Sequence, residues 1–261
     1  MPGSAPASMF SIIIADFCRV VTAKPLLYNV PAFNTSERCG PIGGERRSPL
    51  EQFDILDCTG RKTGARIGRD EAHAAGVWHG AFHCLMAYRG EGRVRALFQK
   101  RSRDKKIAPG LFDVSVGGHY AAGEDAATAG PREIREELGL AVPFPSLVPL
   151  GRRVFVYCFT KGVFEYEFQD VFLLPLEARP ENLVLQAEEV DAVLELEVEE
   201  GIAFFSGKRD AAQGQLLGGL QRRETITVTQ REFVPCIDSY YLKLLLLAQR
   251  YFRGDRDALA I

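Results

Sequence analysis

The sequence predicts an α/β domain, and three observations support this fold class. Segments rich in alternating, β-branched or aromatic residues lie on both sides of an acidic segment at 124–140. Within that segment, Glu133, Glu136 and Glu137 have the i, i+3, i+4 spacing of one helix face. Residues 237–252 repeat apolar side chains at helical spacing. The 261 residues, 46% of them hydrophobic, suffice for a well-packed core.

The expected elements follow in chain order. Residues 1–50 are rich in Pro, Gly and Ser, so we expect a poorly ordered N-terminal appendage, followed by a single domain at 51–261 with a C-terminal helical extension. We expect strands at 53–57, 79–88, 93–101, 111–116, 152–160, 164–174 and 190–196. We expect a short helix at 199–205 and a long one at 237–252, whose core-facing stripe is Tyr240, Leu244, Leu247 and Tyr251.

Charge and cysteine content argue against several classes of protein. The formal net charge of −2 gives no reason to expect binding to nucleic acid. No apolar stretch reaches transmembrane length, and Asp16 interrupts the short apolar run near the N-terminus, so we expect neither membrane insertion nor a signal peptide. Six cysteines are scattered without a CxxC pair. This pattern favours a reduced, cytoplasmic protein over a disulfide scaffold or a zinc module.

The segment from Gly118 to Leu140 is the most informative part of the chain. Its fixed positions read Gly118-x5-Glu124-x7-Arg132-Glu133-Ile134-x-Glu136-Glu137-x-Gly139-Leu140. Carboxylates crowded on one helix face repel one another by a few tenths of a kcal/mol per pair, and a hard cation would turn this repulsion into attraction. Mg²⁺ or Mn²⁺ fits an oxygen-rich set of ligands. A solvated acidic helix is the simpler alternative, but it does not explain the other fixed positions.

This pattern resembles the signature box of the Nudix hydrolases. The resemblance implies a Nudix-type α/β/α sandwich with a mixed β-sheet, in which a strand, a loop and a helix carry the box. It also implies that water cleaves a diphosphate linked to another group X. Glu133, Glu136 and Glu137 would hold the metal and Arg132 would position them, while the backbone of Gly117 and Gly118 would approach the substrate closely. Glu124 fits a structural role better than a catalytic one.

From Phe53 to about Phe172 the chain also resembles the Nudix branch that includes isopentenyl-diphosphate isomerase. The resemblance rests on the stretches 71–73, 78–79, 99–110, 116–119 and 164–167. It implies that a metal is held by the positions His73, His79, His119, Glu165 and Glu167. It likewise implies that Arg101 and Lys105 contact the diphosphate. Imidazoles combined with carboxylates suit a transition metal. Simple capping of strand ends by single histidines remains the alternative, and His83 is expected to be a half-buried strand residue.

Two departures favour a hydrolase over an isomerase. The catalytic cysteine of the isomerases would fall at Gly117, which has no side chain to carry a proton. The isomerases also have a degraded box, whereas every box carboxylate is present here. We therefore expect a metal-dependent hydrolase that cleaves the diphosphate linkage of a nucleoside diphosphate or a related diphosphate-X molecule.

Several alternatives stay open. The chain could instead be an isopentenyl-diphosphate isomerase, or a non-catalytic ligand sensor on the same fold. The general base is Glu133, another box glutamate, or Glu167. The partner is expected to be a small-molecule diphosphate, and a homodimer is one possible assembly.

Pro131 directly precedes Arg132 in the acidic segment. Inside a helix, proline removes a backbone hydrogen bond and costs about 3 kcal/mol unless the helix kinks or starts there. We expect a kink or a late helix start, with residues 132–137 still in helical register.

Overall fold

The computed structural model describes residues 51–160, 162–181, 183–218 and 223–261, and the appendage expected at 1–50 lies outside the described residues. Its strands are β1 (Gln52–Leu56), β2 (Lys62–Gly68), β3 (His79–Gly90), β4 (Arg93–Arg101), β5 (Phe112–Asp113), β6 (Val116–His119), β7 (Val148–Thr160), β8 (Val163–Leu176), β9 (Val190–Glu197), β10 (Ala211–Gly218) and β11 (Arg223–Thr229). Its α-helices are α2 (Arg69–Ala75), α3 (Ala126–Leu138), α4 (Val198–Phe205) and α5 (Tyr240–Phe252). Two short 3₁₀ helices lie at Phe144–Ser146 and Gln230–Glu232.

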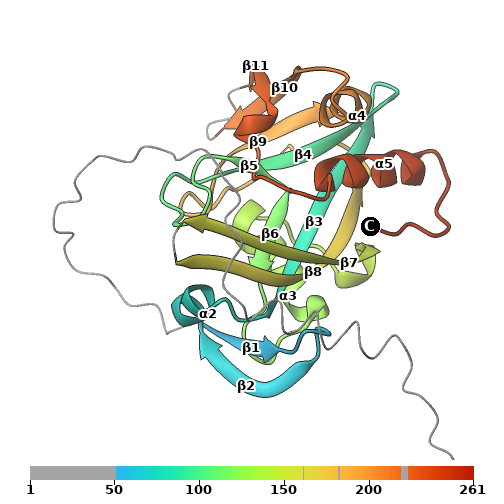
Figure 1. The fold of residues 1–261 in the computed structure, drawn as a ribbon. Helices are drawn as coiled ribbons and strands as arrows, with labels where there is room; N and C mark the ends of the chain where they lie inside the picture. The colour runs from blue at the N-terminus through green and yellow to red at the C-terminus, as the bar shows by residue number, and fades with distance from the viewer. Residues whose placement is uncertain (1–50, 161, 182, 219–222) are drawn as a thin grey trace, which may run out of the picture. The chain divides into compact units, whose positions relative to one another are not determined.

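Nine of these strands form one mixed β-sheet (Figure 1). The order is β11-β10-β9-β4-β3-β8-β7, with β5 beside β4 and β6 beside β3. β3 and β8 run parallel, whereas the other neighbouring strands of this sheet run antiparallel. The remaining two strands, β1 and β2, pair with each other in a separate hairpin. The sheet is therefore mixed, as expected.

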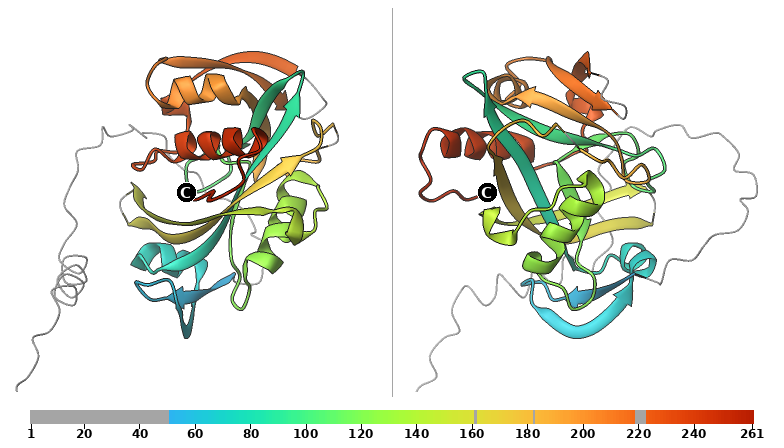
Figure 2. Two further views of the ribbon diagram at one scale, coloured as in Figure 1. Left: turned by 90° about the vertical axis from the view of Figure 1, so that its right-hand side faces the viewer. Right: turned by 180° about the vertical axis from the view of Figure 1, so that it is seen from behind.

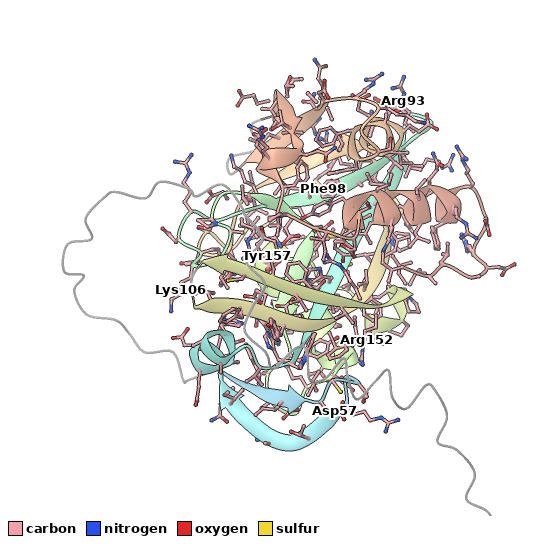
Figure 3. The ribbon with its side chains drawn as sticks, viewed as in Figure 1. Asp57, Arg93, Phe98, Lys106, Arg152 and Tyr157 are labelled. Atoms are coloured by element: carbon pink, nitrogen blue, oxygen red, sulfur yellow. The ribbon has the colours of Figure 1, made fainter. Side chains whose placement is uncertain are left out.

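Helices cover both faces of the sheet (Figure 2). Side chains alternate along β3, so Phe82, Cys84 and Met86 join the core under α3, while Leu85 and Ala87 join the core under α4 and α5. Figure 3 marks Phe98 of β4, which is fully buried on the α4 and α5 side. The α/β/α sandwich expected from the sequence is confirmed.

Helix α3 runs through Pro131 without interruption. It begins at Ala126, where Asp125 caps it by accepting a hydrogen bond from the backbone N–H of Thr128 at 3.0 Å. The late start considered for this helix is therefore wrong, while residues 132–137 do lie in the helix as expected. The helix also packs closely on β3, because a Cβ added at Gly130 would lie 2.7 Å from the Phe82 ring. Capping and packing offset the cost of the proline.

The observed elements differ from the expected ones in several places. β2, α2, β10 and β11 were not expected, one expected strand is split, and one expected helix begins later. The strand expected at 111–116 is split into β5 and β6 by Ser115. Its hydroxyl accepts from the Met86 N–H at 2.7 Å and donates to the Leu97 carbonyl, so it takes the place of ladder hydrogen bonds between β3 and β4. The helix expected from residue 237 begins at Tyr240 instead, because Asp238 turns to Arg153 and Ser239 has a left-handed backbone (φ 54°).

Candidate functional site

Helix α3, which carries the box glutamates, faces the short strand β6, and Glu133 lies directly over Gly118. A Cβ added at Gly118 would lie only 2.2 Å from Cδ of the Glu133 carboxylate. No side chain longer than hydrogen fits at this position unless Glu133 moves. The sequence therefore needs glycine at 118 so that a buried carboxylate can approach the strand.

Arg132 is the hub of the box. Its guanidinium donates to Glu133 Oε1 at 2.8 Å and to Glu136 Oε2 at 3.1 Å. It also makes a two-pronged contact with Glu124, at 3.0 and 2.7 Å, and donates to the His119 carbonyl at 3.3 Å. Glu124 itself accepts from the Ala121 N–H at 2.9 Å. Glu124 thus ties the loop before the helix to Arg132, and Arg132 orients two of the three box carboxylates.

Two of the box carboxylates are buried and electrostatically unfavourable without a cation. Burial raises the pKa of Glu133, although Arg132 opposes the effect. Burial and the neighbouring Glu133 raise the pKa of Glu137 well above its usual value. Glu137 Oε2 accepts from Gln99 at 3.2 Å and from the Gly117 N–H at 3.4 Å. A divalent cation would stabilise both carboxylates, so the donor set fits Mg²⁺ or Mn²⁺.

The three box carboxylates do not themselves form a closed cage. Arg132 lies between Glu133 and Glu136, and the side chain of Glu136 is 50% exposed. Among the described residues, the compact group of possible metal ligands is a different one, formed by His73, His79, His119 and Glu165.

The ligand atoms of this second group lie within 4.8 Å of one another. Glu167 adjoins it, with Oε1 at 3.0 Å from His119 Nε2 and 3.7 Å from His79 Nε2. Three buried atoms of the group have no hydrogen-bond partner: His73 Nε2, His79 Nε2 and Glu165 Oε2. Unpartnered buried polar atoms are costly, and here they converge on one point. Three imidazoles and two carboxylates fit a transition metal.

The charges of this second group also fit a bound cation. Burial, reinforced by His119 and His79, lowers the pKa of His73 to about 3 and keeps this imidazole neutral. Burial and the neighbouring Glu167 raise the pKa of Glu165 to about 10. Burial acts in the same direction on Glu167, but the hydrogen bond from His119 and the nearby His79 imidazole outweigh it and hold the pKa of Glu167 well below its usual value. Neutral imidazoles next to a carboxylate are the state in which a metal is bound.

The group is assembled from four elements that are distant in sequence. His73 lies on α2, His79 on β3, His119 on β6, and Glu165 and Glu167 on β8. The parallel pairing of β3 with β8 sets His79 directly beside Glu167.

One apolar side chain covers this group. Phe53 of β1 is fully buried and stacks on His79 and His119, with ring centroids 4.9 Å apart in each case. No pattern in the sequence indicates this role of Phe53.

Arg101 and Lys105 lie near the box but are held by protein groups. Arg101 donates to the Ile107 carbonyl at 3.3 and 3.0 Å and lies 3.6 Å from Asp113. Lys105 pairs with Glu189. The positive charges of Arg101 and Lys105 partly offset the burial that raises the pKa of Glu137. Both charges are thus near enough to act on Glu137.

His83 is buried rather than half-buried, which corrects the expectation for this residue. Its Nδ1 lies 3.1 Å from the Tyr240 hydroxyl, a contact that depends on helix α5 packing over β3. Burial lowers the pKa of His83 to about 4. Its Nε2 would lie 3.4 Å from a Cβ at Gly117. The position matching the isomerase cysteine therefore faces a neutral imidazole.

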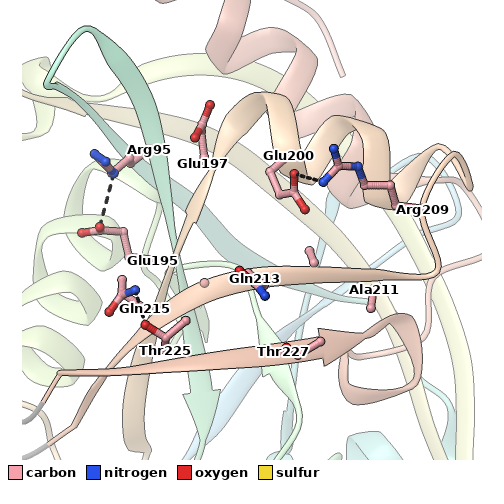
Figure 4. Close-up of a pocket in the computed structure, with 12 residues that line it drawn as sticks. Arg95, Glu195, Glu197, Glu200, Arg209, Ala211, Gln213, Gln215, Thr225 and Thr227 are labelled. Carbon is pink, nitrogen blue, oxygen red and sulfur yellow. Dashed lines mark hydrogen bonds and ion pairs between the residues drawn. The ribbon is translucent and has the colours of Figure 1, made fainter.

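A cavity of about 660 Å³ lies elsewhere, between β9, β10 and α4 (Figure 4). Four of its five charged residues form two ion pairs, Arg95 with Glu195 and Arg209 with Glu200. It contains no residue of the box or of the histidine group. We therefore do not take this cavity as the candidate site, despite its volume.

Comparison with known proteins identifies the family. Residues 77–213 match the family model described as the NUDIX domain. The chain belongs to the Nudix family. It is a Nudix-type enzyme of the class that hydrolyses acid anhydrides, and enzymes of this family generally use a divalent metal. Among the described residues, no helix combines the length and the apolar character needed to span a bilayer.

Three relatives show which proteins this Nudix chain is similar to. An uncharacterised Nudix hydrolase of Clostridium acetobutylicum is 33% identical over 202 residues, which cover 76% of this chain and 96% of the relative. Nudix hydrolase 3 of Arabidopsis thaliana is 38% identical over 62% of this chain, but over only 21% of its own length. An isopentenyl-diphosphate Delta-isomerase of Pectobacterium atrosepticum is 28% identical over 48% of this chain and 65% of its own. The resemblance found from the motifs is confirmed.

Proposed function

We propose that this Nudix enzyme is a Mg²⁺- or Mn²⁺-dependent hydrolase that cleaves the diphosphate linkage of a nucleoside diphosphate or a related diphosphate-X molecule. The observation that carries the proposal is the pair of buried carboxylates, Glu133 and Glu137, on a helix face beside Gly118. Both have a raised pKa, and both are relieved when a cation binds between them and a substrate.

Each box residue has a distinct part in this mechanism. Glu133, Glu136 and Glu137 would hold the cation, which when bound neutralises charge on the diphosphate and lowers the pKa of water. Arg132 fixes the carboxylates of Glu133 and Glu136. The general base is Glu133, another box glutamate, or Glu167. A proton leaving water would pass to that carboxylate as the new oxygen–phosphorus bond forms and the bond from that phosphorus to the bridging oxygen breaks, so that the other phosphate group leaves with the bridging oxygen.

Substrate binding would engage residues that are now paired within the protein. The diphosphate would replace Glu189 as the partner of Lys105, while Arg101 would donate to phosphate oxygens by charge-assisted hydrogen bonds. The backbone of Gly117 and Gly118 would face the substrate without a side chain in between.

We further propose that His73, His79, His119, Glu165 and Glu167 hold a second metal ion, of the transition series. The support is the convergence of three unpartnered buried atoms on one point. The near-neutral net charge and the scattered cysteines support a cytoplasmic enzyme acting on small molecules, and a homodimer is its proposed assembly.

The decisive experiment replaces one carboxylate of the box. Glu136 is half exposed, so Glu136→Gln should leave the fold intact while it removes a metal ligand. A panel of nucleotide, prenyl and vitamin diphosphates is incubated with and without Mg²⁺, and phosphate release is measured. We expect Mg²⁺-dependent release by the native chain and its loss in the variant. The matched control is Glu199→Gln, a helical glutamate on α4 that is more exposed than Glu136 and also pairs with an arginine.

The same panel separates the alternatives. Unchanged turnover in Glu136→Gln would remove the box from the mechanism. Formation of a dimethylallyl product from isopentenyl diphosphate would favour the isomerase. This alternative is tested because the relative from Pectobacterium is an isopentenyl-diphosphate isomerase. Tight binding without turnover would indicate a ligand sensor.

A further inference from the structure

A continuous chain of hydrogen bonds lies behind Glu167. Gln169 Nε2 donates to Glu167 Oε2 at 2.6 Å, and Arg153 Nη1 donates to Gln169 Oε1 at 2.7 Å. Arg153 in turn donates to both carboxylate oxygens of Asp238, at 2.8 Å each. The chain thus runs from the segment before helix α5, through β7 and β8, to the histidine group.

The direction of every hydrogen bond in this chain is fixed by its chemistry. A guanidinium can only donate, so the oxygen of the Gln169 amide must face Arg153. The amide nitrogen must then face Glu167 and can only donate to it. Oε2 of Glu167 is therefore occupied as an acceptor. The other oxygen, Oε1, is the one that faces His119 and His79.

The strand pairing holds this chain of hydrogen bonds in place. Arg153 of β7 and Gln169 of β8 are direct partners in the antiparallel register. Glu165, Glu167 and Gln169 alternate along β8 and so share one face. Gln169 is 1% exposed and Arg153 is 6% exposed, so water does not compete for these contacts. The guanidinium of Arg153 also stacks on Tyr240, the first residue of α5, at 3.8 Å from the ring centre.

Glu165 provides an internal comparison. It belongs to the same group and the same strand face, yet its Oε2 is buried without a hydrogen-bond partner. A buried arginine and glutamine could be replaced by an apolar pair with little loss of stability, so burial alone does not explain them. What the pair does achieve is a fixed orientation for one carboxylate of the group.

We propose that Gln169 is a positioning residue, held by Arg153 and Asp238, which orients Glu167 Oε1 toward the metal of the histidine group. This inference rests on the second metal site of the proposed function. If Gln169 has this role, the metal affinity of that site depends on the contact between Asp238, just before α5, and Arg153. Outer partners of metal ligands act in this way, because they fix the ligand before the metal arrives.

The experiment measures metal binding directly and needs no substrate. The metal-free full chain is titrated with Co²⁺ in excess Mg²⁺, which occupies the oxygen-rich box, and the visible spectrum of bound Co²⁺ is recorded. Gln169→Met keeps the side-chain volume but removes both hydrogen bonds. We expect the Kd for Co²⁺ to rise about 10- to 100-fold. We also expect the Co²⁺ bands to change, which a purely structural role of Gln169 would not produce.

The matched control is Arg152→Gln. Arg152, labelled in Figure 3, is the neighbour of Arg153, and its half-exposed side chain pairs with Asp170 on the opposite face of the same two strands. Its loss should leave both the Kd and the spectrum unchanged. Asp238→Asn is the second test variant, because Asp238 lies at the far end of the chain and is partly exposed. It should weaken Co²⁺ binding less than Gln169→Met does, and it decides the matter if Gln169→Met fails to fold.

The outcomes separate the two proposals. Co²⁺ binding by the native chain together with unchanged binding and spectrum in Gln169→Met overturns the positioning role alone. If Gln169→Met does not fold, unchanged Co²⁺ binding in Asp238→Asn overturns it. Absence of Co²⁺ binding by the native chain overturns the second metal site and the positioning role together, while hydrolysis at the box is tested separately by Glu136→Gln.

Discussion

Adding one methyl group at Gly118 should disable the box without unfolding the protein. In Gly118→Ala the new Cβ would lie 2.2 Å from Cδ and 2.4 Å from both oxygens of the Glu133 carboxylate. The backbone of Gly118 has no positive φ, so alanine is conformationally allowed there. Because the atoms in conflict are the far end of a flexible side chain, the carboxylate moves and the strand stays.

The size of the effect follows from that displacement. Glu133 must retreat by about 0.8 Å before its nearest atom reaches the 3.0 Å that real Cβ atoms keep. A misplacement of about 1 Å in a catalytic constellation can cost about 10²-fold in rate. This corresponds to roughly 2.7 kcal/mol of lost transition-state stabilisation. The free energy of unfolding should change by less than about 1 kcal/mol, since alanine also restricts the unfolded chain.

The assay pairs metal affinity with turnover. Mn²⁺ binding is followed by electron paramagnetic resonance, which needs no substrate, and hydrolysis is followed on whichever diphosphate the native enzyme accepts. Gly117→Ala is the matched control, because a Cβ there meets its nearest atom, His83 Nε2, at an ordinary 3.4 Å. The control should bind Mn²⁺ like the native chain. Native affinity and native turnover in Gly118→Ala would refute the placement of Glu133.

Two further predictions concern stability. Pro131→Ala should raise the free energy of unfolding by about 2 kcal/mol, because the Ala127 carbonyl gains a helical partner, and the greater freedom of the unfolded chain cancels only part of this gain. Urea unfolding that shows no gain would contradict this. His83 has a folded pKa of about 4, below its usual 6.5, so the unfolded chain binds the proton first as the pH falls. The stability from neutral His83 is therefore complete above pH 6.5 and is lost down to about pH 4, a total of about 3 kcal/mol. In metal-free protein, His83→Gln should flatten the pH dependence of unfolding in this window, and identical pH profiles would contradict the assignment.

The elements that the sequence predicts are those in which buried side chains leave a regular pattern of apolar residues. β3, β4, β8 and β9 each bury side chains against a core, so their residues alternate or run apolar, and their positions were predicted closely. β2 was missed because it buries none of its residues. It is held by pairing with β1 and by the Lys62–Asp54 ion pair at 2.8 Å, which leave no periodic apolar signal.

The site residues also differ in how far the sequence predicts them. Glu133, Glu136 and Glu137 share a helix face because of local spacing, so their proximity could be derived from sequence. The histidine group depends on the parallel pairing of β3 with β8, in which each residue pairs with one 88 positions later, as His79 does with Glu167, and only the family resemblance indicated it. Gln169 carried a weak signal, since it continues the alternation of Glu165 and Glu167.

The choice between hydrolysis and isomerisation depends on few positions. The resemblance assigns the metal of the histidine group to the isomerases, and this chain keeps the group without the isomerase cysteine, so the group alone does not decide the reaction class. At Gly117 the nearest side chain is His83, whose pKa of about 4 keeps it neutral near pH 7 and whose Nδ1 is already engaged by Tyr240. Neither a thiol nor a charged imidazole is therefore available there to protonate carbon. The buried carboxylates of Glu133 and Glu137 remain in place, and they suit attack by water on a diphosphate.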